Sequence, residues 1–353
     1  MKALFSPLSL RGLTLKNRIV LSPMQQYSAQ NGKPGQWHLV HLGSRAVGGS
    51  GLILTECTAV SPEGMCTLSD VGIWNQEQVQ AWKEITDFVH AQNCKIGIQL
   101  WHAGGKASTS HPEQGFKPLK AKDGGWSPKS SSATSINEHQ PQEMTLEEIE
   151  KVINDFQQAA KNALDAGFDV IELHAAHGYL LHQFYSALIN KRKDMYGGGF
   201  ENRIRLLREV VTSVREVIPD TMPLFVRLSA VDYSNSIDAW TIEESVRLSE
   251  ILKELGVDFI TASGGGFVQV DQNIVKPGYQ LPLATSIRNQ VNIPVGAVGM
   301  IVDAFQSNEI IENKQADLVV IAREHLRDPY FGIHAAIELE EPADVPWQYK
   351  RAF

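Results

Sequence analysis

The segment Gly167-Phe-Asp-Val-Ile-Glu-Leu-His174 indicates the fold class. It follows an amphipathic pattern over Leu146–Ala166, which opens with the capping box Thr145-Leu-Glu-Glu148 and stops at a glycine. Within it, the run Asp169–His174 is apolar on both faces, as is typical of a parallel strand that helices cover. The segment therefore predicts one helix–strand unit of an α/β protein.

The same alternation continues in both directions along the chain. Seven more apolar runs are predicted as strands: Arg18–Ser22, Gly51–Cys57, Lys95–Trp101, Leu224–Leu228, Asp258–Ala262, Val295–Val298 and Leu318–Ala322. Further helical patterns lie at Glu77–Ala91, at Asn202–Val217 and between the capping box Thr241-Ile-Glu-Glu244 and Gly256. Eight strands with crossover helices predict a (β/α)8 TIM barrel that forms a single domain over residues 1–353. An open doubly wound sheet is the alternative, but no GxGxxG follows the first strand.

Two segments do not fit this repeat. Residues 1–16 precede the first strand and are expected to cap the bottom of the barrel. The polar segment 104–144 follows the third strand, on the side where barrel enzymes place their active sites. Because so long a loop is usually functional, we interpret it as a lid or substrate loop, with surface decoration as the alternative.

Composition narrows the functional class. The 353 residues are 43% hydrophobic and 20% charged, and the formal net charge of −8 disfavours nucleic acid or an anionic membrane as partner. The N-terminus lacks the pattern of a signal peptide, and no apolar run approaches membrane-spanning length. Cys57, Cys66 and Cys94 form no CxxC pair, which favours reduced thiols and a cytoplasmic location.

Residues just past the strand ends are the candidates for chemistry in a barrel. These positions are rich in glycine, arginine and neutral hydrogen-bonding groups, and they contain no HExxH, GxSxG or P-loop motif. Glu56 and Glu172 are the carboxylates near strand ends, and Glu172 is expected to face away from His174. The pattern therefore argues against zinc hydrolysis and against catalysis by a carboxylate pair.

Three groups of these residues suggest a ligand. Backbone amides of Ser263–Gly266, Gly299 and Arg323 are predicted to converge on a phosphate, although tight turns would also explain the glycines. His174 and His177 with Tyr179 suit a carbonyl oxygen that gains negative charge; metal binding and ordinary buried histidines are the alternatives. Arg227 lies inside an apolar strand, so it requires a salt bridge or a cofactor that becomes anionic.

These residues resemble those of the old yellow enzyme family of flavin-dependent ene-reductases, specifically its thermophilic-like bacterial branch. The matching stretches occur in order across nearly the whole chain: Leu15–Ile19, Ser22–Met24, Ile96–Leu100, His102–Gly104, Gly167–Ile171, His174–Tyr179, Tyr196–Gly198, Glu201–Arg203, Phe225–Ser229, Gly296–Met300 and Arg323–Pro329. The resemblance implies a TIM barrel that binds FMN non-covalently. It also implies a ping-pong reaction, in which hydride passes from NADPH or NADH through FMN to the β-carbon of an activated alkene such as an enone or maleimide.

The resemblance also implies a role for each matching position. FMN is expected to contact Ser22, Pro23, Met24, Gln25, Ala59, Gln99, Arg227, Gly299, Ala322 and Arg323. Within this set, Arg227 would stabilise the reduced flavin, while Gly299, Ala322 and Arg323 would hold the phosphate. His174 and His177 would polarise the substrate carbonyl, Tyr179 would protonate the α-carbon, and Tyr27 would line the substrate site.

The chain departs from the family pattern at several positions. Gln25 stands where the branch usually has cysteine, and we interpret this amide as altering the flavin potential. Trp101 replaces a small residue and Gly105 an arginine, which changes the entrance of the site. The tail 345–353 resembles one whose arginine reaches a neighbouring subunit, so a homodimer or homotetramer is expected, with Arg351 at the neighbour's active site.

The expected function is thus reduction of a small electrophilic alkene by an FMN enzyme. The alternatives are a flavin oxidoreductase of a related branch with a different acceptor, or a metal-using barrel lyase with His174 and His177 as ligands. The lyase lacks a third ligand at suitable spacing and leaves Arg227 unexplained. A binding protein without activity would leave the polar strand ends without a role.

Overall fold

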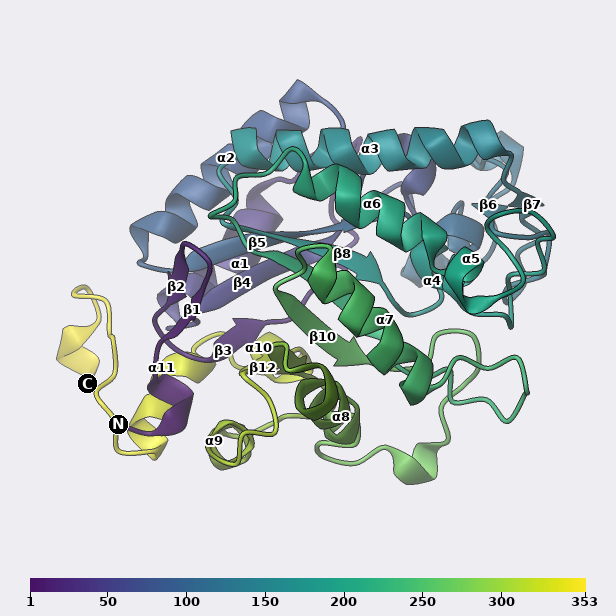
Figure 1. The fold of residues 1–353 in the computed structure, drawn as a ribbon. Helices are drawn as coiled ribbons and strands as arrows, with labels where there is room; N and C mark the ends of the chain where they lie inside the picture. Colours follow the sequence, from purple (N-terminus) through teal and green to yellow (C-terminus); the bar gives the residue numbers. More distant parts are fainter.

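A computed structural model describes residues 1–353, and its main feature is a closed barrel of eight parallel strands (Figure 1). The strands are β3 (Ile19–Leu21), β4 (Leu52–Ala59), β5 (Lys95–Trp101), β8 (Val170–Ala175), β9 (Leu224–Ser229), β10 (Phe259–Ser263), β11 (Val295–Ala297) and β12 (Leu318–Ile321). They follow one another around the barrel in chain order, and β12 pairs with β3 to close it. The predicted TIM barrel is confirmed, and this closure excludes the open sheet.

Helices surround the barrel and connect successive strands. They are α1 (Gln36–Val47), α2 (Gln76–Ala91), α3 (Leu146–Asp165), α4 (Leu180–Tyr185), α5 (Phe200–Arg203), α6 (Arg205–Arg215), α7 (Ile242–Glu254), α8 (Leu281–Val291), α9 (Ala304–Glu312), α10 (Arg323–Arg327) and α11 (Phe331–Glu338). Both predicted capping boxes are present, since Thr145 and Thr241 accept hydrogen bonds from the third helical amide. The predicted helix Asn202–Val217 is two helices, α5 and α6, which meet at Ile204.

The hydrophobic core has two main parts. The larger cluster lies between strands and helices, where α3 buries Ile149, Val152 and Phe156. The smaller cluster combines inward-facing strand residues such as Phe225 and Phe259 with leucines of a hairpin, β1 (Leu8–Leu10) and β2 (Leu13–Leu15). The hairpin thus closes one end of the barrel, as predicted for residues 1–16, and leaves the other end for the site.

The long segment 104–144 folds over the opposite end from the hairpin. It contains a short strand pair, β6 (Lys129–Ser130) with β7 (Gln142–Glu143), and three single-turn 3-10 helices. The indole of Trp126 anchors it by donating to the carbonyl oxygen of Glu63, at 3.1 Å. The tail 345–353 lies beside the N-terminus (Figure 1).

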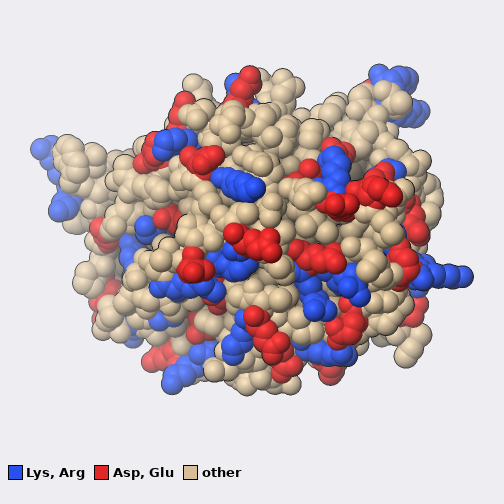
Figure 2. Space-filling view, turned by 45° about the horizontal axis from the view of Figure 1, so that its top comes forward, with Lys and Arg blue, Asp and Glu red and all other residues tan.

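The surface turned toward the viewer in Figure 2 carries acidic and basic side chains interspersed, without a field of one sign. None of the helices combines the length and the apolar character that a membrane crossing requires.

Candidate active site

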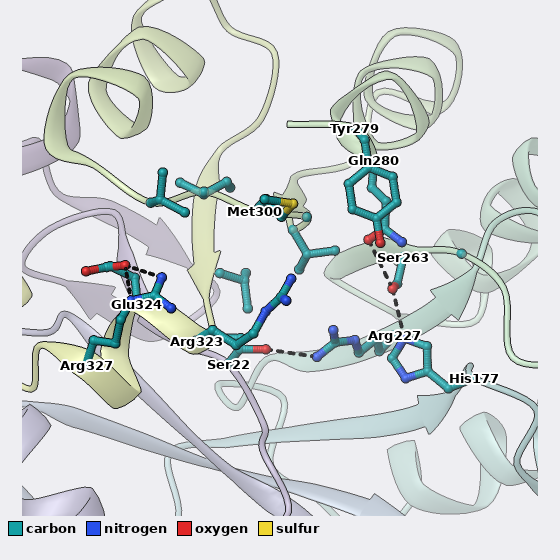
Figure 3. A pocket seen from close by; sticks show the side chains of 17 residues that line it. Ser22, His177, Arg227, Ser263, Tyr279, Gln280, Met300, Arg323, Glu324 and Arg327 are labelled. Atoms are coloured by element: carbon teal, nitrogen blue, oxygen red, sulfur yellow. Dashed lines mark hydrogen bonds and ion pairs between the residues drawn. The ribbon is translucent and has the colours of Figure 1, made fainter. Parts of the chain in front are cut away.

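A cavity of about 390 Å³ lies at the carboxyl ends of the strands, on the side of β3, β9, β10, β11 and β12 (Figure 3). The structure brings together six predicted site residues in its lining: Ser22, His177, Arg227, Gly299, Ala322 and Arg323. Ser263, from the predicted phosphate-binding stretch, and Met300, the last residue of the matching stretch Gly296–Met300, line the cavity as well. The structure also adds Tyr279 and Gln280, which lie in the connection after β10 and which no pattern in the sequence indicated.

Arg227 is a buried cation at the base of this cavity. Its side chain donates to the Ser22 hydroxyl at 3.1 Å, its Nε has no partner, and no carboxylate lies within ion-pair distance. Burial lowers the pKa of the guanidinium, while Glu172 inside the barrel opposes that shift. A buried charge without a contact partner is costly, so the geometry favours an anionic or hydrogen-bonding ligand over a structural salt bridge.

The cavity also has free donors beside the ends of β11 and β12. The backbone amides of Gly299 and Ala322 have no acceptor within the protein, and the Arg323 side chain reaches the cavity without an ion pair (Figure 3). Gly299 has a φ of +106°, and a Cβ there would lie 3.0 Å from that of Gln280. These groups can hold a phosphate, as the glycine-rich strand ends suggested.

The glycines after β10 do not all supply the phosphate donors that were predicted for Ser263–Gly266. Ser263 and Gly264 line the cavity, but Gly265 donates to the Val231 carbonyl and Gly266 packs against the turn at His177. A Cβ on Gly266 would lie 2.2 Å from the His177 carbonyl carbon. We therefore correct the prediction for these two residues: the amide of Gly265 is already paired, and Gly266 allows a close approach of two backbones.

His174, His177 and Tyr179 form one cluster of rings. The His174 centroid lies 5.0 Å from that of His177 and 5.3 Å from that of Tyr179. Trp101 contacts the other side of Tyr179 edge-on, at 5.0 Å. Burial, and then the charge of Arg227, holds the pKa of both imidazoles well below their usual value, and burial raises that of Tyr179 well above its own. The cluster therefore offers neutral imidazoles and a protonated phenol at neutral pH.

The two histidines differ in which ring nitrogens have a hydrogen-bond partner. Nδ1 of His174 is buried without a partner. His177 Nε2 lies 2.8 Å from the Ser263 hydroxyl, which also lies 3.3 Å from Gln280 Oε1 (Figure 3). When the single hydroxyl proton faces Gln280, the Ser263 oxygen accepts from His177 Nε2. When it faces His177, the imidazole proton is on Nδ1 and can be donated to a ligand. Ser263 and Gln280 together therefore decide which nitrogen of His177 carries the proton.

The turn that carries His177 and Tyr179 is held by buried groups. His182 Nδ1 accepts from the Gly178 amide at 2.9 Å, so its Nε2 must carry the proton that faces Asp232 at 2.8 Å. Lys106 donates from its Nζ to the carbonyls of His177 and Gly266, at 2.8 and 2.7 Å. These contacts explain how His177 keeps a left-handed φ of 56°.

A second group of predicted flavin contacts meets on the other side of the barrel. The side chain of Gln25 donates to the Cys57 carbonyl at 3.4 Å, and the Cys57 thiol donates to Gln99 Oε1 at 3.1 Å. Gln25 Oε1 is buried without a partner. Pro23 and Met24 are half-buried, whereas both backbone groups of Ala59 already pair with the segment 71–73.

The remaining predicted residues lie farther from the cavity. Tyr27 is half-buried, and the rings of His111 and Phe116 from the segment 104–144 contact it edge-on, at 5.9 and 6.2 Å. Arg351 is exposed on the tail beside the N-terminus and does not reach the site of its own chain.

The expectation for Glu172 is wrong. Side chains two positions apart on a strand share a face, so Glu172 points into the barrel as His174 does. It accepts from Gln99 and from Thr261, each at 2.7 Å, and it is fully buried. The period of two, applied correctly, would have placed it from the sequence alone.

No group of three His, Cys, Asp or Glu side chains is arranged to hold a metal ion. His174 and His177 have no third ligand beside them.

Comparison with known proteins agrees with this geometry. The model of the NADH:flavin oxidoreductase / NADH oxidase family matches residues 3–341. Proteins named NADPH dehydrogenase from Bacillus subtilis (strain 168) and from Geobacillus sp. (strain WCH70) are each 44% identical to this chain. They cover 100% and 99% of it, over 99% and 98% of their own lengths.

Solved structures agree as well. Morphinone reductase in complex with tetrahydroNAD matches with a TM-score of 0.78 and 26% identity, over 97% of this chain and 92% of that one. A 2-naphthoyl-CoA reductase shares the fold, with a TM-score of 0.86 and 23% identity. The match covers 97% of this chain and 53% of the reductase chain. The chain therefore belongs to the NADH:flavin oxidoreductase / NADH oxidase family, that of the old yellow enzymes, and is a flavin oxidoreductase.

Proposed function

We propose that the protein is an FMN-dependent ene-reductase that uses NADPH to reduce activated alkenes such as cyclic enones and maleimides. The observation that carries the proposal is Arg227, a buried guanidinium without an ion pair, at the base of a cavity that extends to Arg323. FMN matches this arrangement, because its phosphate and its ring edge are both anionic or hydrogen-bond accepting. The name of the Bacillus relatives supports NADPH as the reductant.

The residues that would hold FMN divide into two groups. Arg323 and the amides of Gly299 and Ala322 would bind the phosphate, while Arg227 and Ser22 would bind one edge of the ring. Pro23, Met24, Gln25, Ala59 and Gln99 would surround the rest of the ring. The fit rests on donors that the protein leaves unpaired, chiefly Arg227 Nε and the two amides. When bound, FMN supplies the redox chemistry by accepting a hydride from NADPH and giving it to the alkene.

The protein would contribute orientation and proton transfer. His174 and His177 are neutral donors, and their N–H groups would bind the substrate carbonyl and stabilise the charge that develops on its oxygen. Tyr179, whose buried phenol keeps its proton, would deliver that proton to the α-carbon. Tyr27 would border the substrate.

The test is the visible spectrum of the purified protein under argon, followed by additions of NADPH and then 2-cyclohexenone. We expect a flavin band that bleaches with NADPH and returns with the enone. A band that stays bleached would contradict the ene-reductase and favour a related flavin oxidoreductase with another acceptor. Absence of a flavin band after FMN is added would overturn the proposal.

Two further features belong to the same proposal. Arg351 is exposed on the tail, beside the N-terminus and away from the site of its own chain. This position supports a homodimer or homotetramer in which Arg351 reaches the active site of a neighbouring subunit. The three cysteines are free, which supports a cytoplasmic enzyme with reduced thiols.

A further inference from the structure

Glu172 is a fully buried carboxylate in the interior of the barrel, in register with Gln99 on the neighbouring strand. Its two oxygens accept from neutral donors only, Gln99 Nε2 and Thr261 Oγ1, each at 2.7 Å. Neither Glu172 nor Arg227 takes part in an ion pair, although both lie inside the barrel. Burial raises the pKa of Glu172, and the charge of Arg227 and the hydrogen bonds from Thr261 and Gln99 oppose that shift. Burial lowers the pKa of Arg227, and the charge of Glu172 opposes it. Burying a carboxylate without a cationic partner costs desolvation free energy, so packing alone does not explain why glutamate occupies this position.

The first consequence is the orientation of the Gln99 amide. A carboxylate only accepts hydrogen bonds, so Glu172 must face the NH2 group of Gln99 and not its oxygen. The Cys57 thiol donates to that oxygen from the other side, at 3.1 Å. Gln99 is therefore left with one free N–H and one free lone pair in fixed positions.

The second consequence is the charge balance at Arg227. Because Gln99 and Thr261 satisfy Glu172, its negative charge offsets the guanidinium without occupying the hydrogen-bonding groups of Arg227. A ligand beside Arg227 that gains negative charge thus meets a weaker positive field than Arg227 alone would produce.

We propose that Glu172 is a positioning residue of the flavin site, which fixes the Gln99 amide toward the ring and lowers the reduction potential of the bound cofactor. This inference rests on the proposed binding of FMN. It concerns neither proton transfer nor substrate binding, so it can be tested without turnover.

The experiment measures the reduction potential and the dissociation constant of FMN in the reconstituted wild type and in Glu172→Gln. The variant keeps the shape and an acceptor for Gln99 but removes the charge. We expect its potential to rise, with at least a tenfold gain in affinity for reduced over oxidised FMN, which is about 30 mV for a two-electron couple.

Thr261→Val is the matched control, because it breaks a hydrogen bond to the same carboxylate and keeps the charge. A purely structural role for Glu172 predicts similar effects of both substitutions, whereas our proposal predicts the rise in potential only for Glu172→Gln. The charge role would be overturned if the ratio of affinities for reduced and oxidised FMN in Glu172→Gln stayed within threefold of the wild-type ratio.

Glu172→Asp tests the amide even if Glu172→Gln does not fold. Its shorter side chain keeps the charge but cannot reach Gln99 and Thr261 together, so FMN should bind about tenfold more weakly. Unchanged affinity would overturn the positioning role. If the wild type itself binds no FMN, the proposed function fails, and this inference, which rests on it, fails with it; a wild type that binds FMN and variants without the expected effects overturn this inference alone.

Discussion

At the scale of single residues, the chemistry of the site depends on burial more than on contact between charges. His174 is buried and His177 and Tyr179 are half-buried, and desolvation of this cluster keeps the imidazoles neutral, each with one N–H, and keeps the phenol protonated. Arg227 stays charged in the same region because its own pKa is so high. A neutral donor pair, a proton donor and a fixed cation thus coexist within one site at neutral pH.

Replacing Tyr179 by phenylalanine should separate the two half-reactions. We expect reduction of the flavin by NADPH to change little, and its reoxidation by 2-cyclohexenone to slow by about 10²- to 10⁴-fold, since a general acid is lost. Stopped-flow absorption of each half-reaction measures this. Equal slowing of both steps would contradict the role of Tyr179 as proton donor.

The environment of Lys106 predicts that the affinity for an anionic ligand depends on pH. Burial lowers the pKa of its ammonium to about 8, while its Nζ lies 5.2 Å from the centre of the Tyr179 ring. Below pH 8 the Lys106 ammonium is charged and attracts an anionic ligand. Above pH 8 the neutral amine can still donate to the carbonyls of His177 and Gly266, but it no longer attracts the anion. The affinity for a phenol that is already ionised at pH 6 should therefore fall about fivefold between pH 7 and 9, as loss of ~1 kcal/mol of attraction implies.

Spectroscopic titration of the flavin with that phenol at several pH values measures the effect. Lys106→Met is the control and should show no such step. A step of the same size in Lys106→Met would assign the titration to another group.

At the scale of elements, the decisive unit is β8 with the turn after it. The turn combines His177 and Gly178, both with positive φ, and it is held from below by His182 with Asp232 and from above by Gly266. Asp232 also accepts from Ser186 and from the Trp240 amide, at 2.6 and 2.8 Å. A fully paired buried network of this kind specifies one conformation.

Replacing His182 by phenylalanine should destabilise this unit. The change leaves the Gly178 amide without its acceptor and Asp232 without its donor, at a cost of about 2–4 kcal/mol. His182→Asn should cost less, because its side-chain oxygen can replace Nδ1. Urea unfolding of both variants measures the difference, and equal losses would contradict this assignment of the hydrogen bonds.

The same pair predicts a loss of stability in acid. Burial raises the pKa of Asp232, but the hydrogen bond from His182 and the others outweigh it and leave the pKa below its usual value. The stabilisation is therefore present at neutral pH and is lost as the pH falls below the ordinary range of an aspartate. His182→Phe should weaken this part of the pH dependence of unfolding.

At the scale of the whole molecule, the barrel has one closed and one functional end. The hairpin β1–β2 fills the first with leucines, and the segment 104–144 folds over the second, where its His111 and Phe116 contact Tyr27. The tail leaves the barrel beside the N-terminus and exposes Trp347 and Phe353 as well as Arg351. Such exposed aromatic residues are typical of a surface that binds a partner.

Arg351→Ala should therefore raise the KM for the enone without changing the reduction of the flavin by NADPH. The reason is that Arg351 of one subunit would border the substrate of another, while all of the residues proposed to bind FMN lie within one chain. Steady-state kinetics with sedimentation measures both activity and assembly. Unchanged KM in an intact oligomer would contradict insertion of the tail.

The eight strands and their helical connections could be predicted from the residues, because apolar runs between helical patterns are typical of parallel strands that are buried on both faces. The absence of GxGxxG favoured a barrel over an open sheet, and the pairing of β12 with β3 confirmed it. Lys95–Trp101 has the same bounds in the prediction and in the structure, and the other strands differ by no more than two residues at either end. The same runs also indicated His174 and Arg323, which are polar residues at strand ends, and Arg227, a charged residue inside an apolar strand. A buried polar or charged group requires a hydrogen-bonding or charged partner, which is why such positions point to a ligand.

The tertiary contacts, by contrast, set which of these residues meet and which groups support them. Gly266 approaches His177, Ser263 pairs with its imidazole, and Glu172 reaches Gln99 and Thr261, all across strands or loops far apart in the chain. Such contacts depend on the register and closure of the barrel. The spacing of residues along the chain therefore cannot specify them, because closure is a property of all eight strands together.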